Sequence, residues 1–114
     1  MHEMSLMQSV LDTVRADACE RGMSRVIKVS LVIGEMSMAL PDSLRFAFDV
    51  LTEDELFRGS ALEIEQRPLI LHCRKCEAQS KASNHYLFTC ASCGSGEVDI
   101  IGGRELYIDS YEGE

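Results

Sequence analysis

Apolar residues near the start of the chain recur with the period of an α-helix. The residues that share this spacing are Met4, Met7, Leu11, Val14 and Ala18. Spacings of three and four residues place side chains on one face of a helix, and Gly22 follows as a stop signal. The pattern therefore predicts an amphipathic helix from residue 4 to about residue 21.

A second helix is predicted from Pro41 onward. Proline is tolerated in the first helical turn, and the adjacent Asp42 suits the positive end of the helix dipole. Gly59 marks its expected end. The expected buried face consists of Leu44, Ala47, Phe48 and Leu51.

Three segments show the two-residue alternation of β-strands: residues 26–33, 61–67 and 104–111. In the first of them the side chains predicted to share one face are Ile27, Val29, Leu31 and Ile33. Pro68 ends the second strand. We therefore predict the α+β class, with two helices packed on one face of a three-stranded sheet, built from residues 1–67 and 104–114.

The segment between the second and third strands, residues 68–103, has a different composition. It holds four of the chain's five cysteines and few bulky apolar residues. It is also shorter than the ~40 residues below which a core alone rarely holds a fold. A stabilising cross-link or bound metal is therefore expected, and the sequence predicts an inserted zinc-ribbon-like module.

The cysteines of this segment form two pairs, Cys73-x-x-Cys76 and Cys90-x-x-Cys93. Two such turns bring four thiolates to one tetrahedral Zn²⁺. Four thiolates saturate the metal, so the expected site is structural. Iron in the same cage and two disulfides in an oxidising compartment are the alternatives. His72 and His85 flank the cluster, as surface residues, as hydrogen-bond partners of the sulfurs or as replacement ligands.

The first three residues, Met1-His2-Glu3, form a candidate chelate. Initiator methionine is normally trimmed only before a small residue, so we expect the Met1 amine to remain. That amine, the His2 amide nitrogen and the imidazole Nδ1 can hold one ion in a plane, a geometry that suits Ni²⁺ or Cu²⁺. Glu3, Glu35 or Asp42 could supply a fourth donor. The competing interpretation is an ordinary exposed terminal residue.

Charge and composition narrow the function classes. Eleven Lys and Arg against nineteen Asp and Glu give a formal charge of −8, which disfavours general binding to phosphate backbones. No apolar run approaches the ~18 residues of a membrane span. The start of the chain lacks a secretory pattern, so we expect a cytoplasmic protein with reduced thiols. A monomer is the default expectation, with a dimer formed by strand exchange as the alternative.

Taken together, these motifs resemble the HypA/HybF family of hydrogenase-maturation nickel metallochaperones. The shared features, in order along the whole chain, are Met1-His2-Glu3, Ser5-Leu6, Ile33-Gly34-Glu35 and the paired Cys-x-x-Cys insertion. The resemblance implies Ni(II) held transiently at His2, with Met1 and Glu3 as further donors. It also implies structural zinc at Cys73, Cys76, Cys90 and Cys93. Cys19 has no role in the family pattern, and we expect it to pack in the interior.

The resemblance also implies a function and partners. Members deliver nickel for [NiFe] hydrogenase, and some for urease, with a HypB-type GTPase and the hydrogenase large-subunit precursor as partners. No nucleophile is paired with a base in the sequence, so we expect no enzyme. Two rival functions remain open at this point: a zinc-ribbon adaptor that binds protein or nucleic acid without handling nickel, and an iron–sulfur-like redox protein.

Overall fold

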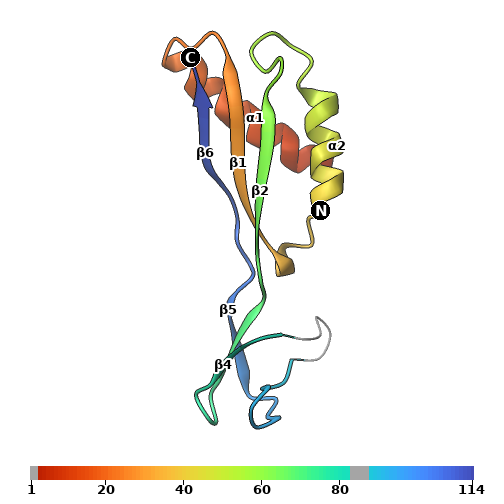
Figure 1. The fold of residues 1–114 in the computed structure, drawn as a ribbon, viewed down its shortest axis with the longest axis vertical. Coiled ribbons are helices and arrows are strands. Elements are labelled where there is room, and N and C mark those ends of the chain that lie inside the picture. Colours follow the sequence, from red (N-terminus) through yellow and green to blue (C-terminus); the bar gives the residue numbers. More distant parts are fainter. Residues whose placement is uncertain (1–2, 83–87) are drawn as a thin grey trace. The chain divides into compact units, whose positions relative to one another are not determined.

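The computed structural model describes residues 3–82 and 88–114 and shows two compact units (Figure 1). The first, here called the helix–sheet unit, comprises Met1–Val32, Ala39–Glu65 and Tyr107–Glu114. The second, here called the cysteine unit, comprises Ile33–Met38 and Gln66–Leu106. Each unit has its own sheet, and each is described by itself.

A three-stranded sheet organises the helix–sheet unit. β1 (Val26–Gly34) lies between β2 (Ala61–Arg67) and β6 (Leu106–Gly113). The sheet carries two helices, α1 (Glu3–Glu20) and α2 (Pro41–Leu51), which pack against each other (Figure 1). The predicted fold class, two helices on a three-stranded sheet with an inserted zinc-ribbon-like module, is confirmed. Within the part of the chain that the structure describes, neither helix has the length and apolar character needed to cross a bilayer.

The buried face of α1 follows the predicted stripe, except that Val10 is buried and Met4 is not. Its buried residues are Met7, Val10, Leu11, Val14 and Ala18. Met4, which belongs to the predicted apolar face, has 40% of its surface exposed. The first turn of α1 borders an open groove beside α2, so Met4 is only partly covered.

β1 departs from strict alternation. Ile27, predicted to share one face with Val29 and Leu31, has 41% of its surface exposed, whereas those two are buried. At the start of the strand the covered side chain is Val26, whose N–H donates to the carbonyl of Leu56 at 2.7 Å. Leu31 and Val32 are both buried although they point to opposite faces. The middle of β1 is thus covered on both sides, as expected for a central strand.

α2 is shorter than the sequence suggested, because it ends at Leu51 rather than near Gly59. The Thr52 hydroxyl donates to the carbonyl of Phe48 at 2.6 Å, and the chain then turns. This turn brings Phe57 into the core, where only 1% of its surface is exposed. Burying a large ring stabilises the turn more than continuing an exposed helix would.

The cysteine unit contains a second three-stranded sheet that the sequence analysis did not predict. β3 (Ile70–Cys73) pairs antiparallel with β4 (Gln79–Lys81) and with β5 (Val98–Gly102). Leu71 faces Ser80 on one side and Ile100 on the other. Leu69 and Leu71, each 1% exposed, form the apolar centre of this unit.

The short segment at the end of β1 and after it belongs to the cysteine unit. Backbone hydrogen bonds hold it in place. It contains the 3-10 helix η1 (Glu35–Ser37). The Gly34 N–H donates to the Glu105 carbonyl and the Met36 N–H to the Gly103 carbonyl, both at 2.6 Å. A Cβ atom at Gly34 would lie 2.1 Å from the Gly103 oxygen. Only glycine therefore fits this crossing without a shift of the backbone.

Candidate metal centre

The two Cys-x-x-Cys segments adopt the same turn. In the first, the Cys73 N–H donates to the Ala78 carbonyl and the Glu77 N–H to the Cys73 carbonyl, both at 2.9 Å. In the second, the Cys90 N–H donates to the Ser95 carbonyl at 2.8 Å and the Gly94 N–H to the Cys90 carbonyl at 2.9 Å. The local sequence therefore builds two equivalent metal-binding turns.

Each turn ends in a left-handed residue at the equivalent position. Gly94 has a φ of 75°, which suits glycine, and Glu77 has a φ of 63° without being glycine. The glycine after the second pair was a readable sequence signal for this conformation. Glu77 carried no comparable signal, so the symmetry of the two turns could not be read from the sequence.

Four sulfur atoms converge between these turns. All lie within 4.8 Å of one another, with Cys73 Sγ 3.7 Å from Cys93 Sγ and Cys76 Sγ 3.5 Å from Cys90 Sγ. A tetrahedron with Zn–S bonds of ~2.3 Å has edges of about 3.8 Å. The cysteines are free thiols rather than disulfides, and their arrangement fits a structural Zn²⁺.

Backbone donors lower the pKa of one thiol in each pair. The N–H groups of Cys93 and Ser92 point at Cys90 Sγ, at 3.4 and 3.3 Å, and lower the pKa of Cys90 to about 6. The Cys76 N–H likewise lowers the pKa of Cys73. At Cys76 the Ala78 amide also lowers the pKa, but the neighbouring Cys90 sulfur and burial outweigh it and raise that pKa to about 12. Such crowding of sulfurs is relieved when a divalent cation binds them.

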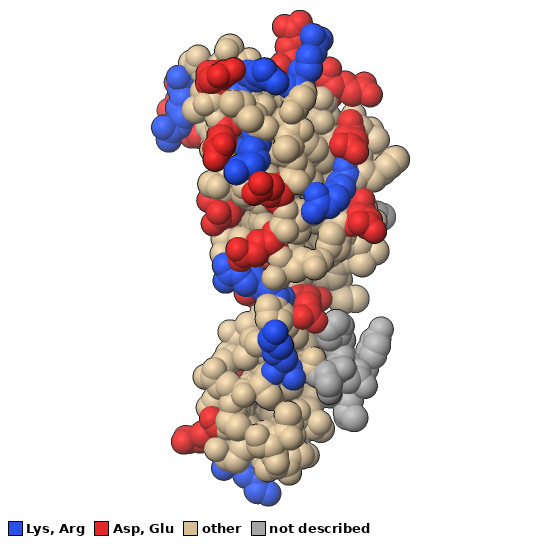
Figure 2. All heavy atoms as spheres, viewed as in Figure 1, with Lys and Arg blue, Asp and Glu red and all other residues tan. Residues whose placement is uncertain are grey.

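The surroundings of the cluster do not resemble a nucleic-acid surface. Arg74, in the first turn, lies 3.7 Å from the carboxylate of Asp99 and forms an ion pair with it. On the face shown in Figure 2, basic side chains do not gather into a continuous patch on the cysteine unit. A phosphate backbone requires several neighbouring cations, so this part of the molecule gives no support to nucleic-acid binding.

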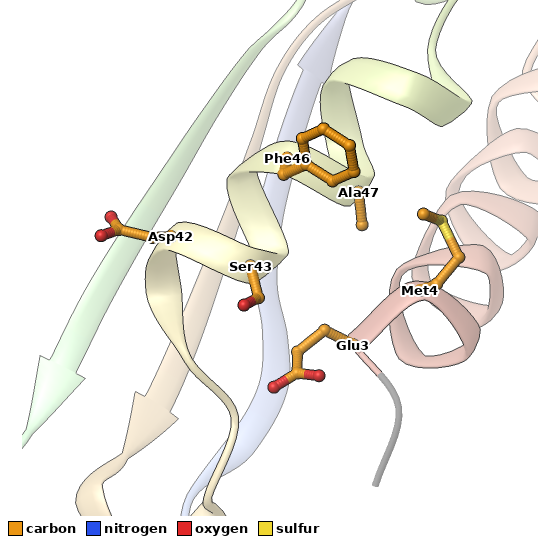
Figure 3. A pocket seen from close by; sticks show the side chains of 6 residues that line it. All are labelled: Glu3, Met4, Asp42, Ser43, Phe46 and Ala47. Atoms are coloured by element: carbon orange, nitrogen blue, oxygen red, sulfur yellow. The ribbon is translucent and has the colours of Figure 1, made fainter.

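The other expected site involves the first three residues, of which only Glu3 is described. Met1 and His2 lie outside the described residues. Glu3 opens α1, and its carboxylate accepts from the Leu40 N–H at 3.4 Å. It borders a groove of about 390 Å³ that it shares with Asp42, from the start of α2 (Figure 3).

The three carboxylates considered as a fourth donor have different surroundings. Glu3 and Asp42 border the same groove. Glu35 belongs to the cysteine unit, where its carboxylate accepts from the Leu69 N–H at 3.2 Å. Of these three carboxylates, Glu3 and Asp42 therefore share the helix–sheet unit.

The remaining cysteine and two of the histidines were also considered in the sequence. Cys19 was expected to pack in the interior, but it is exposed at the end of α1. Its side chain lies off the buried face, whose last residue is Ala18. His72 lies on β3, one residue before the first ligand, and is partly buried. His85 lies outside the described residues.

An α+β unit joined to a four-cysteine ribbon defines a small metal-binding protein. Comparison with known proteins gives the family. Residues 1–113 match the family model HypA, described as "Hydrogenase/urease nickel incorporation, metallochaperone, hypA". The chain belongs to this family, and the resemblance inferred from its motifs is confirmed.

Individual relatives match this chain over nearly their full lengths. The chain is 46% identical over 114 residues to the hydrogenase maturation factor HypA of Moorella thermoacetica, covering 100% of both chains. It is 33% identical to the HypA of Dehalococcoides mccartyi, covering 98% of this chain and 93% of the relative. The solution structure of the Ni metallochaperone HypA from Helicobacter pylori matches with a TM-score of 0.63 and 27% identity, covering 99% of this chain and 97% of that one.

Family membership establishes the general function. The protein is a nickel metallochaperone of hydrogenase maturation, with a four-cysteine cluster that fits structural zinc. The rival interpretation, a zinc-ribbon adaptor that never handles nickel, is not favoured. The family consists of maturation factors, which act on other proteins.

Proposed function

We propose that the chain binds Ni(II) at Met1, His2 and Glu3 and releases it to an acceptor during hydrogenase maturation. The observation that carries the proposal is the match to a nickel-incorporation family that begins at residue 1. The nickel-binding domain in this proposal comprises residues 1–67 and 104–114, and the zinc module comprises residues 68–103. Cys73, Cys76, Cys90 and Cys93 hold the zinc.

The donor chemistry supports a nickel site that can be emptied. The Met1 amine, the His2 amide and the imidazole form fused chelate rings that hold Ni(II) in a plane. Glu3 at the first turn of α1 is the nearest carboxylate in sequence, and Asp42 borders the same groove. A chelate of so few residues releases its ion readily, which suits a carrier.

Zinc has a different role in the proposal. A closed four-thiolate cage leaves no coordination position for a substrate. Metal binding there contributes folding free energy to the cysteine unit. The protein therefore acts by binding and ligand exchange rather than by catalysis.

The partners follow from the family's function. We expect a HypB-type GTPase and the hydrogenase large-subunit precursor to receive the nickel or to assist its transfer, and the same chemistry would serve urease. These partners act in the cytoplasm, where the thiols remain reduced. The net charge of −8 attracts cations and disfavours both self-association and nucleic acid.

Nickel titration of the zinc-loaded, untagged protein tests this proposal. His2→Ala should weaken nickel binding by at least about tenfold, or ~1.4 kcal/mol, and one residue added before Met1 should do the same. The matched control is His72→Ala, on β3 of the cysteine unit, which should leave the affinity unchanged. Below pH ~6.5, protonation of the imidazole should weaken binding.

Spectroscopy provides the second readout. Planar coordination by an amide nitrogen makes Ni(II) diamagnetic, so nickel should leave the proton resonances of α1 sharp. Equal affinity of the parent protein and His2→Ala would exclude the terminal chelate. Broadened resonances around the four cysteines would place the nickel in the zinc cage instead.

A further inference from the structure

Exposed apolar side chains gather around the first turn of α1 and the outer side of α2. The exposed fractions are 40% for Met4, 60% for Leu40, 65% for Phe46 and 44% for Val50. Phe46 and Val50 are four residues apart and share one face of α2, while Leu44, Ala47 and Phe48 face the core. Large apolar groups exposed together mark sites of interaction.

Two of these side chains, Met4 and Phe46, line a groove between the two helices, here called the α1–α2 groove. It has a volume of about 390 Å³ and is lined by Glu3, Met4, Asp42, Ser43, Phe46 and Ala47. Figure 3 shows Met4 on α1 and Phe46 on α2 beside the opening, with the Ala47 methyl group between the helices. A groove between two helices, with an exposed ring beside it, fits the apolar face of a third helix.

The rim of the α1–α2 groove is negatively charged. Glu3 and Asp42 line it from opposite helices. The Glu3 carboxylate lies beside the opening, and the Asp42 carboxylate extends away from Glu3 at the first turn of α2 (Figure 3). Arg45, the only cation of α2, faces β2 instead, because its guanidinium donates to the Leu62 carbonyl at 3.0 Å. An occupant that carries lysine or arginine beside its apolar residues would complement this rim.

We propose that the α1–α2 groove docks an amphipathic helical segment of a protein partner, with basic residues flanking its apolar face. The inference rests on the proposed nickel function, because Glu3 borders the groove and directly follows His2 in the chain. A segment docked there would bring its protein to the terminal chelate, where nickel passes by ligand exchange. The groove thereby selects the acceptor.

Charge argues against two other occupants. A second copy of this chain would place the same carboxylates opposite each other, on molecules that each carry a net charge of −8. An anionic lipid surface would repel the same rim. A basic-flanked helix is the occupant that both the apolar floor and the acidic rim favour.

Fluorescence anisotropy with a designed peptide tests the proposal on the full-length, zinc-loaded, nickel-free protein. The probe is a fluorescein-labelled amphipathic helix with leucines at helical spacing and lysines on both flanks. Phe46→Ala should weaken its binding by about tenfold, the effect of losing a central aromatic anchor. Tyr107→Ala is the matched control, since Tyr107 is 46% exposed on β6 and does not line the groove.

The acidic rim is tested separately. Asp42→Asn should weaken binding of the lysine-flanked peptide by about threefold and flatten its salt dependence. A peptide with glutamates in place of the lysines should bind at least about tenfold more weakly. Equal binding of the two peptides, or equal loss in Phe46→Ala and Tyr107→Ala, would overturn the proposal.

Two further measurements identify the other occupants. Sedimentation showing that the peptide-free protein is a dimer that Phe46→Ala dissociates would assign the groove to a second copy and overturn the proposal. If the protein binds anionic phospholipid vesicles and Phe46→Ala abolishes this binding, the groove would be assigned to a membrane surface and the proposal would be overturned. Phe46→Ala should keep the nickel affinity of the parent protein, and His2→Ala should keep its peptide affinity, so the docking and nickel proposals fail independently.

Discussion

The two units of this protein differ in the side chains that form their interiors. In the helix–sheet unit the interior is a conventional apolar core, which includes Met7, Leu11, Val29, Leu44, Phe48 and Phe57. Among the described residues of the cysteine unit, the buried apolar side chains are Ile33, Leu69 and Leu71, and they lie in the same small unit as two buried cysteines, Cys73 and Cys90. Three aliphatic side chains contribute ~1.5–3 kcal/mol each, whereas ordering the backbone costs ~1–2 kcal/mol per residue. The first unit can therefore fold on its side chains, and the second needs its metal.

Removing the zinc should produce the largest difference in stability between the two units. Cys76→Ser breaks the cage, and structural zinc sites contribute ~10–16 kcal/mol in small metal-dependent peptides. We expect the strands β3 and β5 to lose their dispersed amide resonances while α1 and α2 keep their helical circular dichroism. Cys19→Ser is the control, because Cys19 is exposed on α1 and should change neither signal. Ordered amides in β3 of the metal-free variant would show that the small core suffices.

The reciprocal experiment creates a cavity in the core of the helix–sheet unit. Leu11 is fully buried in α1, so Leu11→Ala should destabilise the helix–sheet unit by ~2–5 kcal/mol through lost burial and a residual cavity. Chemical denaturation followed by helical circular dichroism measures this loss, and zinc content should stay at one ion per chain. Val50→Ala, at a position that is 44% exposed, should cost less than about 0.5 kcal/mol. Loss of zinc from Leu11→Ala would show that the two units are not independently stabilised.

The difference between an apolar core and a metal-dependent unit also explains which parts of the structure the sequence could predict. Periodicity located α1, α2 and the three strands of the first sheet, because in that unit burial of one face decides the structure. It assigned Met4 and Ile27 to the same faces as residues that are buried, because period alone does not show where a neighbouring helix or strand stops covering that face. The end of α2 was missed for a related reason, since Phe57 is drawn into the core by tertiary packing.

In the cysteine unit the sequence showed the ligands but not their scaffold. Spacing alone identified the four cysteines, because metal geometry imposes it. The strands β3, β4 and β5 have three to five residues each, too few for a periodic signal. The acidic rim of the α1–α2 groove was also beyond sequence reasoning, because Glu3 and Asp42 line one groove only when the two helices pack.

A smaller perturbation of the cysteine unit is predicted at Gly34. Its φ of −86° and ψ of 153° are open to any residue, so the cost of Gly34→Ala is purely steric. The new Cβ would lie 2.1 Å from the Gly103 carbonyl oxygen, and the backbone shift should cost ~1–3 kcal/mol. Gly96→Ala is the matched control, since nothing lies within 4 Å of its Cβ position. Amide exchange at Met36 and Gly103 should accelerate in the first variant alone, and equal exchange in both would refute the close approach.

The smallest expected effect is a pH-dependent one in the helix–sheet unit. Asp17 accepts hydrogen bonds from the Tyr111 hydroxyl and the Arg21 guanidinium, and these lower its pKa below the ordinary 3.8. A lowered folded-state pKa contributes stability above the unfolded value, and this contribution is lost as the pH falls through the folded value. The parent protein should therefore melt at a higher temperature than Asp17→Asn at pH 6, and the difference should shrink below pH ~4. Helical circular dichroism reports the melting, and Tyr111→Phe should reproduce part of the loss at pH 6. A melting difference that stays constant from pH 6 to pH 3 would mean that the charge of Asp17 contributes nothing to stability, and that any contribution of this side chain comes from contacts it keeps when protonated.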